Sequence, residues 1–267
     1  MARARSTRPR NQKADRRLML GAASAVDEAW TIPRRWLNSA IAIFLLLPAA
    51  VLTQTFFTSF STATIEHLFW ATEEFWFFAL GSLLWIIAFL AGVGLYGEPR
   101  PLRAYVFGHE LTHAVWVWAM GGRVSAFEVS RTGGYIITDT HNFWIALAPY
   151  FYPIYSIAVV AVYGVVSVFY DVSSQTPLLF GLIGLTWAFH ASFTLWMIPK
   201  GQSDLSSHGT FFSLVIIYLM NLLILIGLLL VAAPEITWAG FGNELLTNAE
   251  DCASFFWEIG SAAVAGG

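Results

Sequence analysis

The chain has 267 residues, of which 57% are hydrophobic and 12% charged, and its mean hydropathy is +0.63. A soluble domain carries about 25% charged residues, so this composition excludes an ordinary soluble protein and predicts that most of the chain lies in lipid. The net charge of −3 and the single Cys252 give no sign of a nucleic-acid partner, an internal disulfide or a zinc site built from several thiolates.

The charges are unevenly distributed along the chain. Residues 1–35 hold nine of the fourteen Lys and Arg residues, ahead of an apolar run that is too long for a signal peptide. We expect this segment to be a solvated, disordered basic tail that contacts anionic lipid. Residues 235–267 carry five acidic residues and no basic one, and we expect an acidic, amphipathic tail. Residues 36–234 form the predicted membrane domain.

Six apolar stretches are long enough to cross about 30 Å of hydrocarbon. They are Trp36–Phe57, Phe75–Tyr96, Leu102–Met120, Phe143–Tyr170, Leu178–Ile198 and Phe211–Ala233. We expect the fourth to bend or break at Pro149 and Pro153. The sequence therefore predicts an all-α, multi-pass membrane protein with about six transmembrane helices, located in the cell (inner) membrane.

Residues 121–140 differ from these stretches because they are rich in strand-forming residues. Gly133 and Gly134 offer a turn between two short runs, so we expect a small β-hairpin directly after the third helix. Unpaired strand edges are not tolerated in lipid, which places the hairpin at the interface or against protein. Its edge is suited to accept an extended peptide as an added strand.

The third stretch contains His109-Glu110-Leu111-Thr112-His113, the pattern H-E-x-x-H. Residues four apart lie on one face of a helix, so both imidazoles can bind one Zn²⁺. Glu110 is then the general base that takes a proton from the zinc-bound water. The alternative is that neighbouring helices satisfy these three side chains without a metal, although placing each of them in an apolar helix costs a few kcal/mol.

A catalytic zinc ion needs a third protein ligand beside a water. The candidates after the motif are Asp139, His141, Asp171, His190, Asp204, His208 and Glu235. The third and fifth stretches run in the same direction if all six cross. The connection after the fifth stretch therefore emerges beside the C-terminal end of the third, where Asp204 and His208 join Asp139 and His141.

Asp204 is the best of these candidates, while Asp139, His141 and His208 stay open. It stands in Pro199–Gly209, a polar break between two apolar stretches of the kind that lines membrane-protein sites. Asp171 and Glu235 emerge on the opposite face and are rejected. His190 lies in the middle of a predicted helix. It remains a candidate to contact a zinc ligand, but not to bind the zinc ion itself.

The order of these features resembles the site-2 protease family of intramembrane zinc metalloproteases, over roughly Leu102–Gly209. The run His109–Ala114 looks like the family's zinc-binding helix, Ala148-Pro149 like the small-Pro step that opens the next span, and Asp204 like its aspartate zinc ligand. The resemblance implies a zinc-dependent endopeptidase acting on membrane proteins or membrane-adjacent peptides. The chain departs from the family in lacking Leu-Asp-Gly and a PDZ-like domain, which suggests a divergent branch.

The membrane orientation can be inferred in two ways. Six crossings with a cytoplasmic N-terminus, which the positive-inside rule favours, put Arg100 and Arg103 inside and Arg123, Arg131 and Lys200 outside. They also put the C-terminal end of the third stretch outside, whereas well-known members of the resembled family hold zinc nearer the cytoplasmic face. Either one inference is wrong for this chain, or one apolar stretch does not cross.

Two other functions fit parts of the sequence. A prenyl-protein protease of the CAAX type also carries H-E-x-x-H in a membrane helix, but its third ligand is expected to be a downstream glutamate, and Glu235 exits on the wrong face. A metal-binding scaffold without activity has no need of Glu110 beside its first ligand. The sequence leaves the substrate and the oligomeric state open.

Overall fold

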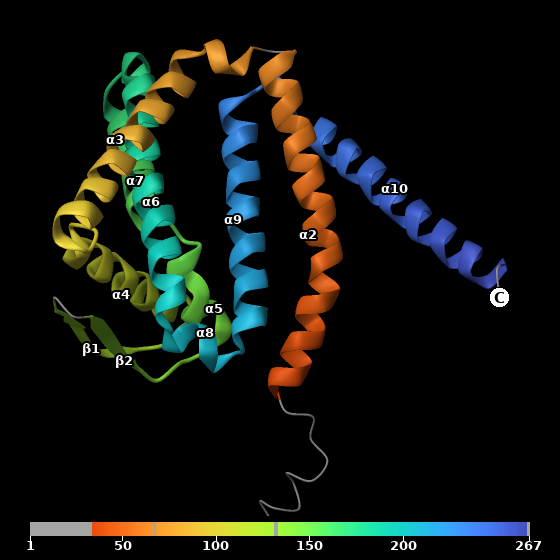
Figure 1. Ribbon diagram of the computed structural model, residues 1–267. Helices are drawn as coiled ribbons and strands as arrows, with labels where there is room; N and C mark the ends of the chain where they lie inside the picture. The colour runs from red at the N-terminus through yellow and green to blue at the C-terminus, as the bar shows by residue number, and fades with distance from the viewer. Residues whose placement is uncertain (1–33, 67, 131–132, 266–267) are drawn as a thin grey trace, which may run out of the picture.

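The computed structural model describes residues 34–66, 68–130 and 133–265, so most of the predicted basic tail 1–35 lies outside the described residues. The helices are α2 (Arg34–Ile65), α3 (Glu73–Tyr96), α4 (Leu102–Ala119), α5 (Phe143–Leu147), α6 (Ile154–Phe169), α7 (Thr176–Met197), α8 (Ser203–Ser207), α9 (Thr210–Ala232) and α10 (Trp238–Ala265) (Figure 1). Short 3-10 turns are η1 (Phe69–Ala71), η2 (Ala148–Tyr150), η3 (Ser173–Gln175) and η4 (Ile198–Lys200). The prediction of a mostly helical chain with several helices that could span a membrane is confirmed.

Four helices are long and apolar enough to cross a membrane, namely α2, α3, α7 and α9. A fifth crossing is added if α5, η2 and α6, which are bent by 80° at the predicted proline break, count as one span. The predicted count of six is not confirmed, because Leu102–Met120 forms α4 but is not among these helices. Arg103, Glu110 and the two motif histidines lower its hydropathy.

The helices form two groups, within which neighbours run in defined directions. In the first group α3 and α7 run parallel, since Gly81 packs on Gly181 and Phe89 on Phe193 further along. Tyr163 near the end of α6 contacts the start of α7, so α6 runs the opposite way. The chain between α3 and α6 therefore begins and ends at the same end of the bundle. Helix α4, the hairpin and α5 all lie at this end (Figure 1).

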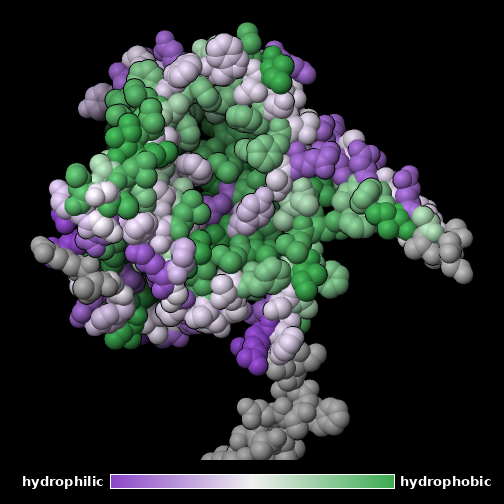
Figure 2. Space-filling view, in the orientation of Figure 1, coloured by the Kyte–Doolittle hydropathy of each residue, from purple (hydrophilic) through white to green (hydrophobic). Residues whose placement is uncertain are grey.

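The second group contains α2 and α9, which also run parallel. Ala42 packs near Phe212 at their starts, and Ala63 packs on Leu229 near their ends. Mostly hydrophobic side chains cover the middle of the molecule, while hydrophilic ones gather at the hairpin, at the start of α2 and along the first part of α10 (Figure 2). This distribution fits a bundle whose middle faces lipid.

The predicted hairpin is present, as β1 (Val124–Val129) and β2 (Gly134–Thr138). The strands are antiparallel, with Val129 opposite Gly134 and an irregularity between Val124 and Ala126. Both strands pack against α4, which brings the hairpin beside the motif helix.

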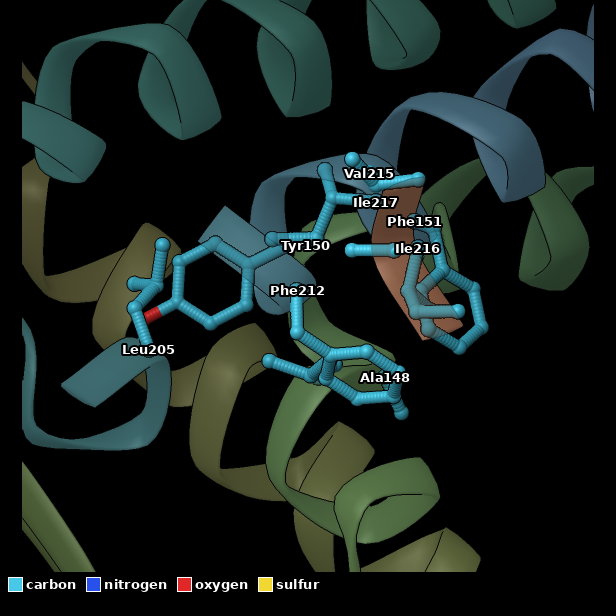
Figure 3. Close-up of a cluster of buried hydrophobic side chains, with 10 residues drawn as sticks. Ala148, Tyr150, Phe151, Leu205, Phe212, Val215, Ile216 and Ile217 are labelled. Carbon is cyan, nitrogen blue, oxygen red and sulfur yellow. The ribbon is translucent and has the colours of Figure 1, made fainter. Parts of the chain in front are cut away.

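A buried hydrophobic cluster fixes the end of the bundle that holds α5, η2 and α8. Tyr150 and Phe151 from the η2 bend meet Leu205 from α8 and Phe212 from the start of α9 (Figure 3). The cluster joins three segments that are distant in sequence and holds the connection after α7 against the η2 bend.

The C-terminal segment forms one long helix, α10, whose far part projects from the bundle (Figure 1). Its first part is fastened to α2 through Asn248, which is buried and hydrogen-bonds to Thr55 and Gln54. These polar residues lie away from the motif helix.

Candidate metal centre

Helix α4 presents the H-E-x-x-H side chains at the end of the bundle. His109 and His113 are four residues apart, and their rings lie 4.9 Å from each other between centroids. Glu110 and His113 are buried, with 7% and 8% of their surfaces exposed. The helical spacing thus places both imidazoles on one side, as predicted.

Asp204 reaches the same place from a different part of the chain. After α7 and η4, Gly201 adopts a left-handed conformation with φ 74° that turns the backbone into α8. Asp204 Oδ2 lies 3.4 Å from Nε2 of His109 and 3.6 Å from Nε2 of His113. In the described part of the chain, this is the one group of three His, Cys, Asp or Glu residues whose ligand atoms lie within 4.8 Å of one another.

The donor set fits a tetrahedral zinc ion. Zn²⁺ binds imidazole nitrogen and carboxylate oxygen at about 2.0–2.2 Å, so two of its ligand atoms stand about 3.3–3.5 Å apart. The two distances from Asp204 Oδ2 are close to this range. Two nitrogens and one carboxylate leave a fourth position for water, which is the arrangement of a catalytic site rather than a structural one.

Hydrogen bonds hold the three side chains in this arrangement. His113 donates from Nδ1 to the carbonyl of Ile145, at 2.7 Å, and this bond turns its Nε2 toward Asp204 and the shared site. The Tyr150 hydroxyl donates to Asp204 Oδ2 at 3.1 Å. Behind the other histidine, the Tyr105 hydroxyl lies 3.4 Å from His109 Nδ1.

The Asp204 carboxyl is stabilised in its ionised form. Burial alone raises its pKa, but the hydrogen bonds with His109 and His113 outweigh burial and hold the pKa well below its usual range. The cluster thus presents a carboxylate at neutral pH, as a metal ligand must.

A cavity of about 260 Å³ opens on the three candidate ligands. Glu110 lines it together with Gln202 of the α7–α8 connection and with four residues of β2, namely Gly134, Tyr135, Ile136 and Thr138. A Cβ at Gly134 would stand 2.7 Å from Cγ of Glu110, so the lack of a side chain there lets the strand approach this carboxylate. The cavity therefore has a carboxylate, three metal-ligand atoms and a strand on its walls.

The other predicted candidates are not part of the cluster. Asp139 is tied to the hairpin, where it accepts a hydrogen bond from the backbone N–H of Arg123. His141 lines the cavity, and its ring is 5.6 Å from that of His208 between centroids. Asp171 lies in the α6–α7 connection and so at the far end of the bundle.

Tyr150, Tyr105 and Ile145 are not predicted from the sequence. Tyr105 precedes His109 by one helical turn, a spacing that could have identified it. The sequence contains no local signal for Tyr150 or the Ile145 carbonyl, because the fold of η2 and α5 against α4 brings them to the site.

Comparison with known proteins found no matching family model, curated protein or solved structure.

Proposed function

We propose that the chain is a zinc-dependent endopeptidase that hydrolyses peptide bonds of membrane-embedded or membrane-adjacent substrates. The observation that carries this proposal is the convergence of His109, His113 and Asp204 on one cavity that Glu110 also lines. A purely structural zinc site is closed by four protein ligands and has no use for a buried carboxylate beside it. The resemblance to the site-2 protease family supports the same function.

The roles of the residues follow from this arrangement. The two histidines and Asp204 would hold the zinc ion, which when bound lowers the pKa of a water molecule and polarises the scissile carbonyl. Glu110 takes the proton from the attacking water and delivers it to the nitrogen of the leaving amine. Glu110 is buried but lines the cavity beside α4, so its carboxylate can reach a substrate that enters there.

The hairpin gives the substrate a place to lie. Gly134, Tyr135, Ile136 and Thr138 of β2 line the cavity, and among the described residues β2 pairs with β1 alone. An extended peptide added beside β2 would run along the cavity wall past Glu110. A substrate helix must therefore unwind locally before cleavage.

We propose a cytoplasmic position for the metal centre and for the N-terminus, in the cell (inner) membrane. The end of the bundle that holds α4, α5, α8 and the candidate metal centre is called the metal end here. The described basic residues lie at this end: Arg34, Arg35, Arg100, Arg103, Arg123 and Lys200. The connections at the opposite end carry Glu66, Glu73, Glu74, Asp171 and Glu235 instead. This asymmetry supports the assignment by the positive-inside rule, and it differs from the six-span expectation because α4 begins and ends at one end of the bundle.

The alternative functions have less support. A CAAX-type prenyl-protein protease would use a downstream glutamate as third ligand, but Glu235 follows α9 at the end of the bundle opposite Asp204. A metal-binding scaffold without activity leaves the burial of Glu110 unexplained.

The test compares the wild-type chain with Glu110→Gln, both reconstituted in vesicles with single-span model substrates. We expect Glu110→Gln to keep its zinc and to lose cleavage by at least about 100-fold, because the general base is removed and the ligands are kept. Glu98→Gln is the matched control, since it neutralises an exposed glutamate in the α3–α4 connection that does not line the cavity. Equal cleavage by Glu110→Gln and wild type would refute the mechanism, and zinc binding without cleavage would favour the scaffold.

A further inference from the structure

His190 is buried in the middle of α7, with 7% of its surface exposed. Its Nε2 atom has no hydrogen-bond partner among the described residues. A buried polar atom without a partner destabilises the fold, so a role for the atom is expected.

The surroundings of His190 include a candidate zinc ligand. A small cavity of about 20 Å³ is lined by both His190 and His109, together with Tyr105 and Tyr155. One water molecule needs a cavity of about 10–15 Å³ and two to four polar partners. The cavity is thus large enough for one water, and both histidines are on its wall.

His109 needs an acceptor on this side. Its Nε2 faces Asp204 in the candidate metal centre, so in the zinc-bound form the proton of the ring is on Nδ1. Histidines that bind a metal almost always donate this second N–H to a carboxylate, a carbonyl or a water. The Tyr105 hydroxyl is 3.4 Å from Nδ1, which is longer than a normal hydrogen bond of this kind.

We propose that His190 is a positioning residue, which orients His109 through one buried water molecule. The water accepts a hydrogen bond from His109 Nδ1–H and donates one to His190 Nε2. The ring of His190 also hydrogen-bonds the backbone of Tyr150, and because Nε2 has no partner, this bond uses Nδ1. Each polar atom of the pair then has a partner. The inference rests on the proposed zinc site and adds a residue from α7 to it.

The test is the affinity for zinc, measured by competition with a chelator on the purified full chain. His190→Leu removes the hydrogen-bond acceptor and puts an apolar side chain of similar size in its place. We expect zinc binding to weaken by about 10- to 100-fold, as is typical when an outer partner of a ligand is lost. His190→Gln restores an acceptor and should bind zinc within a few-fold of wild type.

Thr194→Val is the matched control, because the Thr194 hydroxyl is a second buried atom without a partner on the same face of α7 but does not line the cavity. It should leave the zinc affinity unchanged. Wild-type affinity in a folded His190→Leu chain overturns the inference, whereas a wild-type chain that binds no zinc overturns the proposed function itself. If His190→Leu does not fold, a zinc-bound wild-type structure decides, by an ordered water between the two histidines or none.

Discussion

One oxygen of Asp204 carries most of the polar contacts at the candidate metal centre. Oδ2 faces Nε2 of both His109 and His113 and also accepts the hydrogen bond of the Tyr150 hydroxyl. Because the two imidazoles are neighbours on one helix, they define only two corners of the site. The carboxylate from α8 closes it from the opposite side.

Replacing Asp204 by Asn should therefore remove zinc from the protein. An amide is neutral and a poor zinc ligand. We therefore expect the zinc affinity to fall by more than the roughly 10- to 100-fold that is typical when a hydrogen-bond partner of a ligand is substituted. Zinc content after dialysis measures it. Asp139→Asn is the control, since Asp139 contacts the hairpin backbone instead. If Asp139→Asn loses zinc and Asp204→Asn keeps it, the ligand set is wrong.

The side chains of the site differ in how far the sequence could predict them. His109 and His113 follow from helical spacing alone. Asp204 is predicted from chain direction on the assumption that Leu102–Met120 crosses the membrane, whereas the parallel course of α3 and α7 is what brings it to the metal end. Tyr150 depends on the bend between η2 and α6, which no local pattern in the sequence specifies.

At the scale of elements, the closest contact in the bundle is between α3 and α7. A Cβ on Gly81 would collide with the carbonyl oxygen of Gly181, and one on Gly184 with the carbonyl oxygen of Phe78. The two backbones touch because small residues line both helices, a common way for membrane helices to pack. Helix α7 carries His190 and leads to Asp204, so this contact also positions the site.

We expect Gly81→Ala to separate the two helices. Overpacking of this kind costs about 1–3 kcal/mol, and the carbonyl it meets is backbone, which cannot rotate away. Thermal unfolding of the purified protein in detergent would show a lower midpoint. Gly94→Ala lies on the same helix with nothing within 4 Å of the new Cβ, and should be neutral or slightly stabilising. Equal midpoints for the two variants would contradict the packing argument.

The apolar pattern predicts some elements closely and misjudges others. The limits of α3, α7 and α9 lie within two residues of the predicted stretches. Helix α2 is predicted to end at Phe57 but continues to Ile65. In this extension Thr58 and Thr62 donate to carbonyls one turn back, so their hydroxyls find partners within the helix. The predicted crossing by Leu102–Met120 is not confirmed, since an apolar run does not show where its ends lie in space.

At the scale of the whole molecule, the helix directions separate the charges. Helices α2, α6 and α9 start at the metal end, and α3 and α7 finish there. The α2–α3, α6–α7 and α9–α10 connections are therefore all at the other end, where the described ionisable residues are acidic. The hairpin, α8 and the start of α2 share one end (Figure 1).

This arrangement predicts which loops are accessible from outside the cell. In a Cys252→Ser background, single cysteines at Ser125 in the hairpin, Ser206 in α8 and Ser174 in the α6–α7 connection replace exposed side chains. An impermeant maleimide added to intact cells should label Ser174→Cys. It should label Ser125→Cys and Ser206→Cys after the membrane is opened, because the basic end is expected inside. Labelling of Ser125→Cys in intact cells would put the metal centre outside, and opposite results for Ser125→Cys and Ser206→Cys would mean that α4 crosses after all.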